Sequence, residues 1–124
     1  MASLHPDLLV QTKFYILTGT SATDVYTVGD NGESAIFLTG VTVVDSTGSV
    51  ATAATVAIRR SGTNYVLAST GLALPSATEN LAIVCEPAIR MIRSDTVRVT
   101  GANGHHVFVS YRPVGISTGT TAQQ

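Results

Sequence analysis

The sequence predicts an all-β protein, an antiparallel two-sheet sandwich that is jelly-roll-like and has about eight strands. Two observations support this prediction. Thr96–Thr100 and His106–Tyr111 alternate strictly between valine and mostly polar residues, which is the period of a half-buried strand. In addition, no segment shows a sustained helical period, and short strand-like segments are separated by turn residues.

The first predicted strand follows the N-terminal arm. Gln11–Leu17 alternates so that Phe14 and Ile16 share one face, opposite Tyr15 and Leu17. This alternation predicts a strand.

The next two predicted strands are separated by a turn. Thr23–Val28 ends at Gly29–Gly32, a turn sequence rich in residues that accept positive φ. Glu33–Asp45 follows, and its apolar phase flips at Gly40. A glycine at such a flip predicts a β-bulge or a bend between two sheets.

The second half of the chain continues this pattern. The further predicted strands are Val50–Ile58, Tyr65–Ala68, Asn80–Cys85 and Ala88–Arg93, followed by Thr96–Thr100 and His106–Tyr111. Alternate residues of the first of these share a face, and Arg59 and Arg60 mark its exposed end. Ser69–Glu79 contains Pro75 and is expected to be a loop between sheets. The turn Gly101–Gly104 is expected to join the last two strands as a hairpin.

The length of 124 residues corresponds to a single domain, residues 1–124, with an N-terminal arm over residues 1–10 and a flexible C-terminal tail over residues 115–124. A chain of this size buries roughly two thirds of its unfolded surface, so it needs no metal or disulfide. The single cysteine, Cys85, excludes an internal disulfide and is expected to be a small buried residue. The N-terminus lacks the basic start of a secretory signal, and no apolar stretch has the length of a membrane span.

Charge is unusually sparse in this sequence. Charged residues make up 12% of the chain and the net charge is -1, whereas an ordinary soluble domain has about 25% charged residues. Lys13 is the only lysine. Because interfaces are depleted in lysine and glutamate, this composition favours a subunit that packs among neighbours. The alternative is a monomer made soluble by its hydroxyl groups.

The residues that could carry chemistry do not form a recognisable catalytic or metal motif. His105 and His106 are adjacent on a predicted strand and therefore point to opposite faces, which argues against a shared metal. His5 is too remote in the sequence to be joined to this pair, and we do not expect a three-histidine site across subunits. Asp30 and Glu33 match only part of a calcium loop, so we interpret them as turn residues. No serine lies in a nucleophile elbow, and we expect neither enzymatic activity nor a cofactor.

Arginine provides most of the positive charge. Arg90, Arg93 and Arg98 recur in predicted strands and are candidates for an interface ladder with carboxylates of another copy, or for phosphate contacts. The slightly acidic net charge and the few aromatic residues argue against nucleic-acid binding. The absence of tryptophan argues against a carbohydrate-binding module, which stacks sugars on aromatic rings.

Three segments resemble small β-sandwich virion proteins of tailed bacteriophages. They are Val25–Val28, then Val41–Thr52, and then Ile89–Arg93 before the last two strands. The resemblance is one of pattern and extends from about residue 12 to about residue 113. Two turns depart from the family pattern, since Gly29-Asp30 replaces a common proline and Ser94-Asp95 replaces a common Gly-Asp.

The resemblance implies a structural role in a virion, with synthesis in the host bacterial cytoplasm. We expect a capsid decoration or cement subunit that forms a small symmetric oligomer such as a trimer and binds the major capsid protein lattice. One sheet surface would pack against other copies, while the arm and the tail reach neighbouring proteins. The expected interface residues are Leu4, Leu8, Leu9, Arg90, Arg93, Arg98, His105, His106 and Tyr111. The alternatives are a tail, neck or fibre component, and a free-standing glycan- or peptide-binding module.

Overall fold

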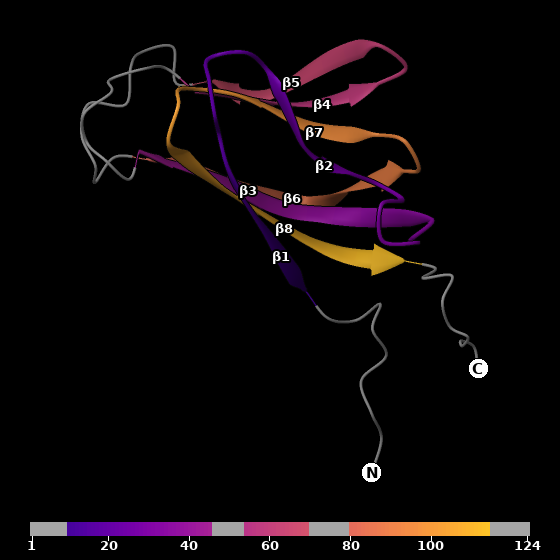
Figure 1. The fold of residues 1–124 in the computed structure, drawn as a ribbon. Coiled ribbons are helices and arrows are strands. Elements are labelled where there is room, and N and C mark those ends of the chain that lie inside the picture. Colours follow the sequence, from indigo (N-terminus) through magenta and orange to yellow (C-terminus); the bar gives the residue numbers. More distant parts are fainter. Residues whose placement is uncertain (1–9, 46–53, 70–79, 115–124) are drawn as a thin grey trace.

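The computed structural model describes residues 10–45, 54–69 and 80–114, and this part of the chain forms eight strands and no helix. The strands are β1 (Gln11–Ile16), β2 (Thr23–Thr27), β3 (Ala35–Asp45), β4 (Thr55–Arg60), β5 (Thr63–Ser69), β6 (Asn80–Ile92), β7 (Thr96–Thr100) and β8 (His105–Val114). They form two antiparallel four-stranded sheets, β1-β8-β3-β6 and β2-β7-β4-β5, which lie one above the other (Figure 1). The predicted all-β sandwich is confirmed. In the described residues, no helix is long and apolar enough to cross a membrane.

The strand order is that of a jelly roll. β1 pairs with β8, β2 with β7, β3 with β6 and β4 with β5. The chain is therefore equivalent to one long hairpin whose tip is the turn at Ser61 and Gly62, wound so that successive strand pairs alternate between the two sheets. Pairing of β8 with β3 and of β7 with β4 completes each sheet.

The core lies between the two sheets and follows the alternation of the sequence. Val97, Val99, Val107 and Val109 are all fully buried, as their spacing predicts. Cys85 is 7% exposed and belongs to the same cluster, which confirms that it is a core residue.

The predicted bulge at Gly40 is present. Both pairings of β3 shift register between Leu38 and Gly40, and the apolar residues on either side of the shift are buried. A Cβ atom on Gly40 would lie 2.9 Å from the Ile83 carbonyl oxygen, which is closer than real Cβ contacts. Glycine therefore lets β3 change phase while it stays close to β6.

The predicted hairpin at the end of the chain is wrong. β7 and β8 lie in different sheets, and Gly101–Gly104 carries the chain from one sheet to the other. The Leu17 N–H donates to the His105 carbonyl at 2.9 Å, and the Gly104 N–H donates to the Leu17 carbonyl at 2.8 Å. Alternation indicates which face of a strand is buried. Two strands that pair in one sheet and two strands that face each other from opposite sheets, about 10 Å apart, show the same alternation, so the pattern cannot distinguish the two cases.

The two predicted strands at Asn80–Cys85 and Ala88–Arg93 form one strand, β6. Both halves pair with the same partner, since Val84 lies opposite Gly40 and Ile89 lies opposite Leu38. The residues between them bulge from the ladder, and Pro87, which has no N–H, lies in this bulge on the edge of the sheet.

Some predictions fall outside the described residues. These are the arm before Val10 with Leu4, Leu8 and Leu9, the first half of the strand predicted at Val50–Ile58, most of the loop predicted at Ser69–Glu79, and the tail from Gly115.

Candidate interaction surface

The outer face of the β1-β8-β3-β6 sheet exposes several large apolar side chains. Phe14 is 47% exposed, Ile16 44%, Phe108 37% and Val84 80%. They project from three strands of the same sheet on the side away from the core. A gathering of exposed apolar groups on one sheet face is typical of an interaction surface.

The centre of this face is an aromatic cluster formed by Phe14, His106 and Phe108. Phe14 and Phe108 lie opposite each other on β1 and β8, and their ring centroids are 5.0 Å apart. The His106 ring meets Phe14 edge to face at 5.1 Å. These ring contacts restrict the side chains, so covering them with a partner costs less conformational entropy than ordering isolated side chains.

The same face has a cationic end. Phe37 on β3 lies between Arg112 on β8 and Arg90 on β6 in one cross-strand row. The Arg112 guanidinium stacks over the Phe37 ring at 4.8 Å from its centroid. The face therefore combines an apolar end with two guanidinium groups, which suits a partner surface that carries both apolar groups and carboxylates.

The three arginines expected to form an interface ladder do not lie on one surface. Arg90 projects from the outer face of β6, whereas Arg98 is on β7 in the other sheet and pairs with Asp24 at 2.9 Å. Arg93 follows β6, and its side chain approaches Gly29. Because β6 and β7 belong to different sheets, these three arginines do not form one row across a single sheet.

Two other expected interface residues have buried side chains. His105 is fully buried, and its Nδ1 accepts a hydrogen bond from the Ala102 N–H at 3.1 Å. Tyr111 is 6% exposed and packs its ring against Tyr26 at 4.6 Å. Both side chains belong to the core of the subunit, so we correct their assignment to a contact surface. His106 contacts the exposed Phe14, so the two histidines lie on opposite faces of β8 as predicted.

Buried carboxylates have structural partners. Glu33 is 1% exposed, and it accepts hydrogen bonds from the Tyr26 hydroxyl and from the Asn31 N–H. Burial raises the pKa of Glu33, but the hydrogen bonds from Tyr26 and backbone N–H groups outweigh this effect and bring the pKa below its ordinary value. Glu33 therefore closes its own turn as an ionised group, which extends the prediction that it is a turn residue.

Asp95 forms the second buried carboxylate site. Its carboxylate accepts hydrogen bonds from Arg60 Nη2 at 2.6 Å, from Arg60 Nε at 3.0 Å and from the Ile92 N–H at 2.9 Å. Burial raises the pKa of Asp95, and the Arg60 and Ile92 hydrogen bonds lower it further than burial raises it. This arrangement fastens the β6-β7 turn to the end of β4.

Within residues 10–45, 54–69 and 80–114, no three histidine, cysteine, aspartate or glutamate side chains are grouped closely enough to hold a metal ion. Burial raises the pKa of the Cys85 thiol, which makes it a poor nucleophile.

Comparison with models of known protein families finds no match, and a search of curated proteins finds no similar sequence.

Sequence reasoning did not identify the aromatic cluster, although the sequence contains a signal for it. The segment Gln11–Leu17 is apolar on both faces, and Phe108 interrupts the polar positions of His106–Tyr111. A sandwich buries only one face of each strand, so apolar residues on both faces predict an exposed apolar surface.

Proposed function

We propose that this protein is a structural subunit of a bacteriophage virion, a capsid decoration or cement protein that assembles with copies of itself and with the shell. The observation that supports this proposal is the exposed apolar face of the β1-β8-β3-β6 sheet with its aromatic cluster. This face is an efficient contact for a neighbouring subunit, because covering it removes apolar surface from water.

Two further features support the same proposal. The chain carries 12% charged residues and a net charge of -1, so little repulsion opposes the approach of identical copies. Jelly rolls are common in viral capsid proteins, although the same fold also occurs in lectins and cupins, so the fold supports a shell role only by analogy.

The test is to add the purified full-length protein to candidate tailed-phage capsids and to image the mixture by negative staining. Saturable density at regular lattice positions is the expected result. A protein that stays monomeric at high concentration and leaves every capsid bare would overturn the proposal.

Deletion of residues 1–10 tests the proposed role of the arm. We expect the deleted protein to keep its β-sheet circular dichroism spectrum and to lose binding to particles, because β1 begins at Gln11 and the core lies beyond it. Unchanged occupancy on particles would show that the arm makes no necessary contact. A tail, neck or fibre component is the alternative within this class, and the number of copies per particle distinguishes it.

A free-standing glycan- or peptide-binding module is the second candidate. One observation favours it, namely an open pocket that contains the exposed Tyr65 and the side chain of Arg60. This function predicts a monomer, and binding of the monomer to a glycan array would favour it.

A further inference from the structure

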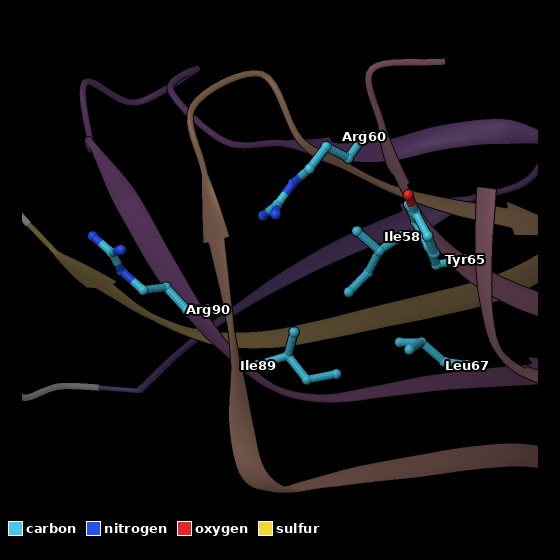
Figure 2. Close-up of a pocket in the computed structure, with 6 residues that line it drawn as sticks. All are labelled: Ile58, Arg60, Tyr65, Leu67, Ile89 and Arg90. Atoms are coloured by element: carbon cyan, nitrogen blue, oxygen red, sulfur yellow. The ribbon is translucent and has the colours of Figure 1, made fainter. Parts of the chain in front are cut away.

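A pocket opens between the two sheets, and it is lined by β4 and β5 of one sheet and by β6 of the other. Its volume is about 310 Å³. It is lined by Ile58, Arg60, Tyr65, Leu67, Ile89 and Arg90, and we call it the edge pocket. Figure 2 shows Ile58, Leu67 and Ile89 facing one another across it, with Arg60 at one end.

The edge pocket is mainly apolar and has a cationic rim. The Arg60 guanidinium is held by Asp95. Arg90 lies on the other side of the β6 ribbon from Ile89 (Figure 2). Among the described residues, Arg90 has neither an ion pair nor a hydrogen bond. A complementary occupant would therefore bring apolar side chains and a carboxylate.

The N-terminal arm has this chemistry. Its sequence places Leu4, Leu8 and Leu9 around Asp7 within the nine residues that precede Val10. Nine residues of extended chain span about 30 Å. The length, the apolar content and the single carboxylate of the arm all suit the edge pocket.

β1, which follows the arm in the sequence, and the edge pocket lie at opposite edges of the sandwich. β1, from which the arm leaves, is the first strand of its sheet, and β6 is the last. When identical subunits associate head to tail, one edge of each meets the opposite edge of the next, and such contacts form a ring when the rotation between successive subunits closes. In such an arrangement, β1 of one copy lies beside the edge that carries the pocket of its neighbour.

The strand register places the start of β1 in one cross-strand row with the pocket. Gln11 pairs with Tyr111, Tyr111 with Leu38, and Leu38 with Ile89. The residue at which β1 begins and a residue that lines the edge pocket thus lie in one cross-strand row. A neighbouring copy that meets this edge at the same height therefore has the start of its β1 beside the pocket.

We propose that the edge pocket receives the N-terminal arm of a second copy of this chain, with Leu8 in the apolar part and Asp7 beside Arg90. This inference rests on the proposed function, because it requires copies to associate. The inference goes beyond the proposed function by naming the segment and the pocket through which the copies would associate.

Disulfide trapping between two full-length variants tests the proposal. A chain with Leu8→Cys is mixed with a differently sized, tagged chain with Tyr65→Cys under mild oxidation, and the products are separated on a non-reducing gel. The expected product is a covalent dimer that contains one chain of each size. The matched control replaces Tyr65→Cys by Val66→Cys, because Val66 is the neighbouring residue on β5, is 62% exposed and does not line the pocket.

A second measurement uses association of the full-length protein. Leu67→Glu places a charge in the edge pocket and is expected to weaken self-association at least tenfold, whereas Val66→Glu on the same strand is expected to change it less than twofold. A synthetic peptide of residues 1–10 should dissociate the wild-type oligomer, and a scrambled peptide should not.

The outcomes separate this proposal from the proposed function. A mixed disulfide that requires Tyr65→Cys supports the edge pocket. Equal trapping at both positions, or a Leu8→Cys, Tyr65→Cys double variant that closes only within single chains, overturns it. If trapping fails while the protein still assembles and decorates capsids, the pocket proposal is wrong and the proposed function stands.

Discussion

Removal of the aromatic cluster is predicted to weaken assembly strongly. The perturbation is the double variant Phe14→Ser, Phe108→Ser, which leaves the inner face of β1 and β8 unchanged. The exposed fractions of 47% and 37% leave about 90 Å² of Phe14 and about 75 Å² of Phe108 in contact with water. At about 25 cal/mol per Å², burying both exposed areas in an interface contributes about 4 kcal/mol to the free energy of association. This corresponds to a change of about a thousandfold in the association constant. This is an upper limit, since association also orders side chains and removes water from polar groups.

The assay is sedimentation equilibrium over a wide range of protein concentration, with circular dichroism to verify the fold. The control is Val66→Ser, which removes an apolar side chain that is 62% exposed on the other sheet. We expect the double variant to associate between tenfold and a thousandfold more weakly and the control to match the wild type. If the double variant associates as strongly as the wild type, the apolar face is not the contact and the reasoning from exposed area is refuted.

Two further predictions concern stability. Gly40→Ala should lower the free energy of unfolding by about 1–3 kcal/mol, because the added Cβ meets the backbone of β6. Gly19→Ala, where a Cβ has no neighbour within 4 Å, should change it little, and equal effects at the two sites in denaturant titrations would contradict this account. The pKa values of Glu33 and Asp95 are lowered from their ordinary values of 4.5 and 3.8. Each carboxylate should therefore contribute fully to the free energy of unfolding at a pH above its ordinary pKa, and this contribution should be lost progressively as the pH falls below that value. Thermal unfolding at a series of pH values checks this, and a melting temperature that does not fall between pH 5 and pH 3 would count against it.

The positions of most strands were predictable because they depend on local patterns. β7 has the predicted bounds, and the bulge at Gly40 follows from an apolar phase that changes at a glycine. The burial of Cys85 follows from its apolar neighbours. Each of these properties is encoded within about ten residues of sequence, where alternation and turn residues act directly on the backbone.

The partners of buried polar groups were not predictable in the same way. Asp95 receives Arg60 from 35 residues away, and the side chain of Glu33 lies inside the protein although its sequence context is a turn. Nothing in the local pattern distinguishes these carboxylates from those that face solvent. The partners become visible only when distant strands are brought together.

The sequence by itself determined that the protein is all-β and where most of its strands lie, because a period of two follows from the geometry of an extended backbone. Only the tertiary structure decided which strands are neighbours. The wrongly expected hairpin between β7 and β8, the aromatic cluster built from β1 and β8, and the edge pocket built from β4, β5 and β6 all depend on this choice. The physical reason is that strand pairing is made by backbone hydrogen bonds that are alike for every sequence. The partner of a strand is therefore selected by the packing of the whole core and not by the strand itself.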